Sequence, residues 1–172
     1  MTGSSAMIAV IGCGNANRTD DGAGLEVVKI LRGSSAIAAR SDVRLLDAGT
    51  DGMAVMFAAR GCTTLIVVDS CWTEADAGAI FEVPGREVET PHTPSLNLHD
   101  FRWDHALYAG RQIYRDAFPE DVIAYLIEAH SLELGCGLTA DVARSAAIVA
   151  QRIEARIMAR AACTTRSGRT HD

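Results

Sequence analysis

Residues 64–68 place the strongest single constraint on how this chain can fold. They read Thr-Leu-Ile-Val-Val, a run without a charged residue in which four of the five residues are β-branched. A strand with no alternation of polar and apolar residues is typical of one that is buried on both faces of a parallel sheet. Because helices cover both faces of such a sheet, this run predicts an α/β domain.

The remainder of the chain alternates between strand-like and helix-like segments. The other strand patterns fall at residues 6–12, 43–47, 79–83 and 122–128. Between residues 138 and 158 the apolar side chains recur with helical spacing. We expect a three-layer α/β/α sandwich around a five-stranded, mostly parallel, twisted sheet, with right-handed crossovers that give a strand order beginning 2-1-3.

A chain of 172 residues is long enough to bury the core of one domain. We expect that domain to span residues 1–159. Residues 160–172 are rich in Arg, Thr, Ser and Gly, and we expect them to form a disordered tail.

Composition and charge exclude several classes of partner. The net charge of −6 argues against binding to nucleic acid. No apolar run approaches the roughly 20 residues of a membrane span, and the first residues lack the features of a signal peptide. Five cysteines without a CxxC pair are typical of free thiols in a reducing compartment, so we expect a cytoplasmic protein that contacts no membrane.

Carboxylates gather where the first and third predicted strands end. A glycine-rich turn follows the first strand and leads to Asp20 and Asp21, and Asp69 directly follows residues 64–68. In open α/β sheets the sites lie at the carboxyl ends of the strands, so we expect these side chains to face one pocket. They could bind a metal or move a proton, but Asp20 and Asp21 could also cap the following helix, and Asp69 could be a turn residue.

Histidines in a long loop offer a third ligand. His92 and His99 lie between residues 84 and 100, and His105 falls in the first turn of a helix that we expect from Asp104 to about Phe118. Two carboxylates and one imidazole would suit a divalent cation such as zinc or nickel, with coordination positions left open. Spacing alone does not choose among these histidines.

Other kinds of catalytic site have weaker support. Cys71 lies close to the expected pocket, but no specific activating partner is evident, and we expect a buried, unreactive thiol.

A nucleotide-binding enzyme is a further alternative. Asn17 stands where a dinucleotide fingerprint has its third glycine, and the acidic pair would repel phosphate.

An ordered set of motifs resembles the hydrogenase maturation proteases, the endopeptidases that trim the C-terminus of the [NiFe]-hydrogenase large subunit. The set covers about residues 7–158 and consists of Gly12-Cys-Gly-Asn15, Asp20-Asp-Gly-Ala-Gly24, Asp47-Ala-Gly-Thr-Asp-Gly52, Leu65-Ile-Val-Val-Asp69, His99-Asp100 and Gly137-Leu-Thr139.

The resemblance implies that Asp21, Asp69 and His99 are the catalytic residues that contact the metal. It implies that this metal is nickel already carried by the large-subunit precursor, with another divalent cation as the alternative. The precursor is then the partner, and we expect the protease to act as a monomer. Residues 101–107 depart from the family pattern, which leaves His105 as a rival to His99. A non-proteolytic nickel-binding or chaperone-like accessory protein of the same fold is the alternative function.

Overall fold

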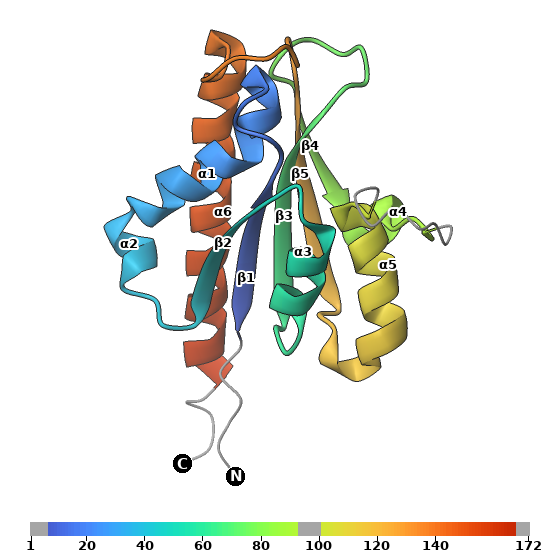
Figure 1. The fold of residues 1–172 in the computed structure, drawn as a ribbon. Coiled ribbons are helices and arrows are strands. Elements are labelled where there is room, and N and C mark those ends of the chain that lie inside the picture. Colours follow the sequence, from blue (N-terminus) through green and yellow to red (C-terminus); the bar gives the residue numbers. More distant parts are fainter. Residues whose placement is uncertain (1–6, 93–100, 168–172) are drawn as a thin grey trace.

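The computed structural model describes residues 7–92 and 101–167 and contains the predicted five-stranded sheet (Figure 1). The strand order is β2-β1-β3-β5-β4, which confirms the predicted beginning 2-1-3. The first four strands in this order are parallel, and β4 pairs antiparallel to β5 at the edge. The strands are β1 (Ile8–Cys13), β2 (Val43–Gly49), β3 (Thr64–Cys71), β4 (Ile80–Pro84) and β5 (Asp121–Glu128).

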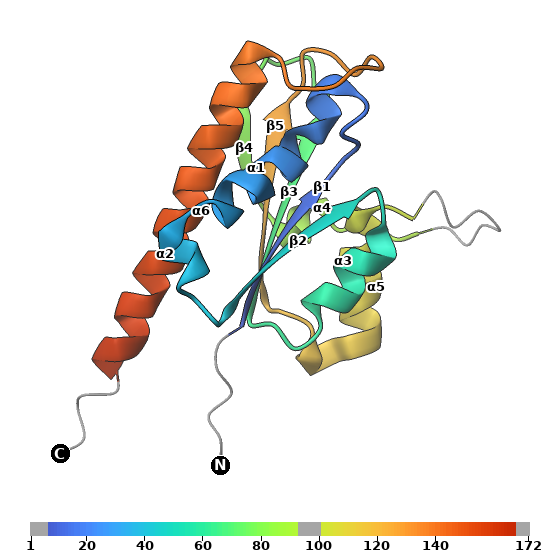
Figure 2. The same cartoon turned by 60° about the vertical axis from the view of Figure 1, so that its left-hand side comes forward.

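Helices cover both faces of the sheet, which confirms the three-layer sandwich (Figure 2). On one face lie α1 (Ala23–Arg32), α2 (Ser35–Ala38) and α6 (Ala140–Ser167). On the other face lie α3 (Gly52–Ala59), α4 (Gly85–Val88) and α5 (Trp103–Tyr114). The described residues also contain two short 3-10 turns, η1 (Thr19–Gly22) and η3 (Arg115–Ala117).

Strand β3 has the double burial that its sequence predicts. Ile66 and Val68 belong to the core under α1 and α6, whereas Leu65 and Val67 belong to the core under α3 and α5. Each of these four side chains is at most 1% exposed. Since successive side chains of a strand point to opposite faces, the strand contributes to both cores at once.

Two helices begin or end differently from the expectation. Helix α5 starts at Trp103 with Arg102 at its N-cap position, so the predicted cap at Asp104 is wrong. The Nδ1 atom of His105 instead accepts a hydrogen bond from the Arg102 backbone N–H, at 3.3 Å. Helix α6 continues past its expected end near Met158 to Ser167, and residues 168–172 lie outside the described part of the chain.

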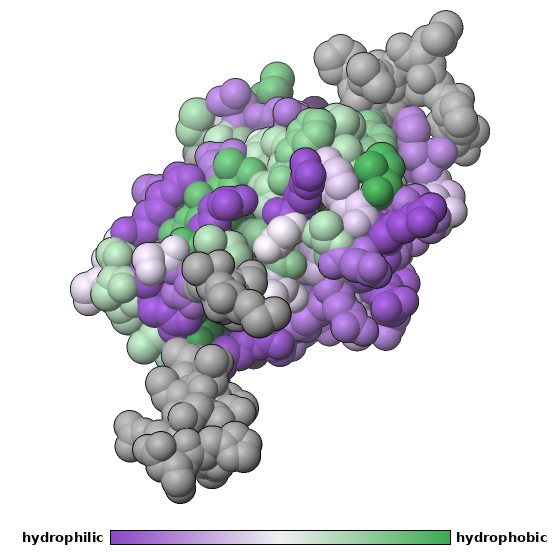
Figure 3. Space-filling view, turned by 90° about the horizontal axis from the view of Figure 1, so that it is seen from below, coloured by the Kyte–Doolittle hydropathy of each residue, from purple (hydrophilic) through white to green (hydrophobic). Residues whose placement is uncertain are grey.

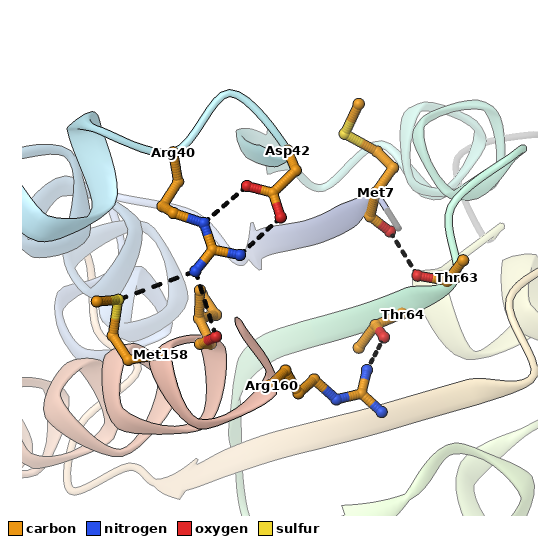
Figure 4. A network of polar contacts seen from close by, with 8 residues as sticks. Met7, Arg40, Asp42, Thr63, Thr64, Met158 and Arg160 are labelled. Carbon is orange, nitrogen blue, oxygen red and sulfur yellow. Dashed lines mark hydrogen bonds and ion pairs between the residues drawn. The ribbon is translucent and has the colours of Figure 1, made fainter. Parts of the chain in front are cut away.

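Polar contacts hold α6 against the end of the sheet where the strands begin (Figure 4). The Arg40 guanidinium donates to both carboxylate oxygens of Asp42, at 2.7 and 2.6 Å, and to the Ile157 carbonyl, at 3.5 Å. Arg160 of the same helix donates to the Thr64 hydroxyl at the start of β3. These contacts lie at the end of the sheet opposite to the pocket described below.

The surface at this lower end mixes hydrophilic and hydrophobic residues, and hydrophilic ones cover much of it (Figure 3). Across residues 7–92 and 101–167, the helices are all too short or too polar to cross a membrane.

Candidate active site

A cavity of about 350 Å³ opens at the carboxyl ends of β1, β2 and β3. Its walls come from six places: the end of β1 with the next residue, Asp21 of η1, residues 49–52 after β2, residues 69–72 at the end of β3, the start of α5, and Leu132 after β5. Both Asp21 and Asp69 line it. The structure therefore brings these two predicted site residues into one cavity, because β1 and β3 are neighbours in the sheet.

A glycine lets the backbone of Asp21 lie close to the end of β1. Gly14 has φ = +118°, a conformation that residues with a side chain rarely adopt. A Cβ atom at this position would lie 1.8 Å from the Asp21 carbonyl oxygen and 3.4 Å from the Asp69 Oδ1 atom. A side chain at this position would therefore collide with the Asp21 backbone, whereas its contact with Asp69 would be an ordinary one.

Asp20 has a structural role that differs from the expected helix cap. The N-cap of α1 is Gly22, and Asp20 is fully buried. Its carboxylate accepts hydrogen bonds from the backbone N–H groups of His130 (2.9 Å), Ser131 (3.0 Å) and Thr139 (2.7 Å) and from the Thr139 hydroxyl (3.0 Å). Burial opposes the charged form, but these hydrogen bonds outweigh it and lower the pKa of Asp20. Asp20 therefore connects the glycine turn to the segment between β5 and α6.

Asp21 and Asp69 each accept hydrogen bonds from neutral groups. The Asp21 Oδ1 atom accepts from the Ser70 hydroxyl (2.9 Å), and its Oδ2 atom accepts from the Asn15 N–H (3.2 Å). The Asp69 Oδ1 atom accepts from the Ser70 N–H (2.8 Å), and its Oδ2 atom accepts from the Trp103 Nε1–H (2.7 Å). Each of the four carboxylate oxygens thus has one neutral donor.

Burial dominates the electrostatics of Asp69, whose side chain is 7% exposed. Loss of hydration raises the pKa of Asp69 to about 6, although the hydrogen bonds from Trp103 and Ser70 and the charge of Arg102 oppose the shift. The negative charge of Asp21 raises this pKa further. Asp69 is therefore ionised at neutral pH and becomes protonated in mild acid.

Within the described part of the chain, neither carboxylate of this pair forms an ion pair, although Arg102 lines the same cavity and pairs with Asp104. Among residues 7–92 and 101–160, the ion pairs do not involve Asp21 or Asp69. Two adjacent carboxylates that are not held in an ion pair favour a bound cation. The pair alone does not make a metal site, and the described residues contain no group of three His, Cys, Asp or Glu side chains that could hold an ion.

The structure does not bring a described histidine into the cavity lining. His99 lies in residues 93–100, outside the residues that the structure describes. The rings of His92 and His105 contact each other, with centroids 4.8 Å apart, and Phe101 packs against both. Neither His92 nor His105 belongs to the cavity walls.

Sequence reasoning missed a buried carboxylate beside the cavity. Glu128, at the end of β5 opposite Cys71, is 1% exposed and accepts from the Thr73 N–H (2.7 Å), the Thr73 hydroxyl (2.8 Å) and the Cys71 thiol (3.3 Å). Burial and the neighbouring Glu128 raise the pKa of Cys71 to about 12. The thiol therefore stays protonated, as expected for an unreactive cysteine. The acidic end of an apolar strand beside β3 was the available signal for Glu128.

Sequence reasoning also missed Ser70 and Trp103 as partners of the carboxylates. Ser70 could have been found, because it directly follows Asp69 at a strand end. No local pattern distinguishes Trp103, whose partner lies 34 positions earlier in the chain.

One comparison with known proteins identifies a family. A family model described as hydrogenase maturation protease (HycI) matches residues 26–156. Comparison with curated proteins gives no match.

Several solved structures share the fold. The hydrogenase maturating endopeptidase HybD from E. coli is 24% identical in sequence, with a TM-score of 0.73 over 88% of this chain and 92% of that chain. The [NiFe] hydrogenase maturation protease HybD from Thermococcus kodakarensis is 19% identical, with a TM-score of 0.67 over 86% of this chain and 97% of that chain. HycI from T. kodakarensis KOD1, also a [NiFe] hydrogenase maturation protease, is 18% identical, with a TM-score of 0.65 over 87% and 90%.

Proposed function

The chain belongs to the hydrogenase maturation protease family, and on this basis we propose that it removes the C-terminal extension of a nickel-loaded [NiFe]-hydrogenase large-subunit precursor. Its membership confirms the resemblance seen in the sequence motifs, and the protein is accordingly a peptide hydrolase. The observation that carries the proposal is the pair of carboxylates, Asp21 and Asp69, which share one cavity and form no ion pair with a described residue.

In this proposal Asp21 and Asp69 bind the nickel ion that the precursor carries. Nickel accepts oxygen and imidazole ligands, and His99 would add an imidazole to the two carboxylates. Another divalent cation in the precursor would suit the same ligands. A precursor without the ion would leave the carboxylates unpaired, so the protease would recognise only a large subunit whose metal centre is assembled.

Hydrolysis requires that water attack the scissile carbonyl and that the leaving amine gain a proton. Ligation by Asp21 and Asp69 would hold the peptide next to the cavity, where the ion can polarise the carbonyl or a water molecule. A carboxylate within hydrogen-bond reach of that water could instead act as general base. Asp69 is suited to accept a proton near neutral pH because its pKa is about 6.

We also propose a cytoplasmic, monomeric enzyme. Cys13, Cys62, Cys71 and Cys136 are free thiols, as is usual for proteins of a reducing compartment. One chain supplies both carboxylates and the four hydrogen-bond donors that its described residues direct at them, so the carboxylate pair is held within a single copy.

Cleavage of a purified, nickel-loaded precursor tests the proposed function. Intact mass spectrometry should show that the wild-type protein removes a C-terminal peptide, and that Asp21→Ala and Asp69→Ala remain folded but do not. Binding of the cognate precursor without any loss of mass would support the alternative, a non-proteolytic accessory protein. Family membership favours the peptidase over that alternative. Cleavage by both variants at the wild-type rate would show that the site lies elsewhere.

A further inference from the structure

We propose that Ser70 and Trp103 are positioning residues, which hold Asp21 and Asp69 in one arrangement through neutral hydrogen bonds. This inference deepens the proposed function and rests on it. Of the four donors to the two carboxylates, the Asn15 N–H and the Ser70 N–H belong to the backbone. The other two, the Ser70 hydroxyl and the Trp103 indole N–H, are side-chain groups that substitution can remove.

Ser70 connects the two carboxylates because of its place in β3. Val67 and Asp69 point towards the layer of α3 and α5, whereas Val68 and Ser70 point towards the layer of α1 and α6. The Ser70 hydroxyl can therefore reach Asp21, which lies in η1 just before α1. The Ser70 N–H donates to Asp69 at the same time, so one residue sets the relative position of both carboxylates.

Trp103 fixes Asp69 from the layer of α3 and α5, on the other face of the sheet from Asp21. Its indole is buried, at 7% exposure, and the hydrogen bond to the Asp69 Oδ2 atom is a buried contact of 2.7 Å. The start of α5 is in turn fixed by Gly52 of α3, since a Cβ atom at Gly52 would lie 2.3 Å from the Phe101 carbonyl oxygen. Close packing between the start of α3 and the start of α5 thus positions the Trp103 indole N–H within hydrogen-bond distance of the Asp69 carboxylate.

Neutral donors suit carboxylates that must bind a cation. An Arg or Lys partner would neutralise the pair and compete with the ion for the same oxygens. A hydroxyl and an indole N–H occupy one lone pair of an oxygen each and leave its charge in place. Outer partners of this kind orient metal-binding groups, and their loss typically costs about 10- to 100-fold in metal affinity or activity.

The kinetic test uses Ser70→Ala, Ser70→Thr and Trp103→Phe with the nickel-loaded precursor. We expect kcat of Ser70→Ala and Trp103→Phe to fall about 10- to 100-fold, with KM within about twofold of wild type. Ser70→Thr keeps the hydroxyl and should recover the rate to within about threefold. Wild-type rates in both Ser70→Ala and Trp103→Phe would overturn the inference, as would a failure of Ser70→Thr to improve on Ser70→Ala.

Ser145→Ala provides the matched control. The Ser145 hydroxyl is also largely buried and donates to the Gly78 carbonyl at 2.6 Å, but this contact lies between α6 and the turn before β4. Its loss should lower the melting temperature about as much as Ser70→Ala does and leave kcat unchanged. An equal fall of kcat in both variants would show that general destabilisation explains the effect.

A measurement on the protein alone separates this inference from the proposed function. The chain has two tryptophans, so its ¹H–¹⁵N spectrum contains two indole signals. Trp103→Phe identifies the signal of Trp103, and Asp69→Asn should shift that signal. If the signal shifts but the wild-type protein cuts no precursor, the proposed function fails while the hydrogen bond stands. If Asp69→Asn leaves both signals in place, the inference fails whatever the activity.

Discussion

Asp20→Asn should destabilise the fold and Asp21→Asn should not, although the two residues are adjacent in the chain. Asp20 is fully buried and accepts four hydrogen bonds, three at its Oδ2 atom and one at its Oδ1 atom. An asparagine has only one acceptor oxygen. Its amide group would therefore face the Thr139 N–H as a second donor, and this buried N–H would lose its partner.

The expected cost follows from these contacts. A buried donor left unpaired costs about 1–3 kcal/mol, and the three remaining bonds each lose part of their strength when a charged acceptor becomes neutral. Relief from burying a charge offsets some of this loss. We expect Asp20→Asn to lower the free energy of unfolding by about 3 kcal/mol. For a domain of this size that corresponds to a fall of about 6–12 °C in the melting temperature.

Asp21→Asn is the matched comparison. Its amide oxygen can accept from the Asn15 N–H, and its NH₂ group can donate to the Ser70 hydroxyl, so both contacts can survive. Its stability should stay within about 1 kcal/mol of wild type. Thermal unfolding followed by circular dichroism measures both variants at pH 7. The reasoning is refuted if Asp20→Asn melts within about 2 °C of wild type, or if Asp21→Asn falls as far as Asp20→Asn.

Three further predictions concern the same site. The cleavage rate should fall as the pH drops through about 6, because protonation of Asp69 removes a metal ligand, and a flat rate between pH 5 and 8 would contradict this. The raised pKa also means that ionised Asp69 destabilises the fold above pH 6, by about 3 kcal/mol for a shift from 3.8 to about 6. In urea unfolding Asp69→Asn should therefore be more stable than wild type at pH 8, and this advantage should shrink as the pH falls from 6 to 4; an advantage that does not change with pH would rule out this cause. Gly52→Ala should displace the start of α5 and lower kcat at least about tenfold, and wild-type kinetics would show that the close approach to Phe101 can relax without loss.

The layers of the fold could be predicted because local patterns determine them. Residues 64–68 are apolar on both sides of the strand, and such a strand is stable only when both faces are covered. The alternation of strands and helices along the chain makes β1 and β3 parallel neighbours. Their carboxyl ends therefore lie side by side and bring Asp21 and Asp69 to one cavity. The right-handed crossovers and the strand order that follows from them were sufficient to predict that these two aspartates share a site.

The contacts that distinguish one aspartate from the next could not be predicted locally. Asp20 has its partners 110 to 119 positions later in the chain, after β5. A helix cap was the natural prediction for an aspartate before a helix, but the long-range backbone donors bind it instead. The N-cap of α5 was predicted two residues late for a similar reason, because packing against Gly52, and not a side-chain cap at Asp104, fixes the start of the helix. His99 remains a prediction.

The most direct test of the central claim is to give the wild-type protein two forms of the same precursor, nickel-loaded and nickel-free. Intact mass spectrometry would record the loss of the C-terminal peptide over time. If Asp21 and Asp69 recognise the ion that the substrate carries, only the nickel-loaded form is cut, and adding nickel to the metal-free form restores cleavage. Equal cleavage of both forms would show that the carboxylate pair acts without the metal of the substrate.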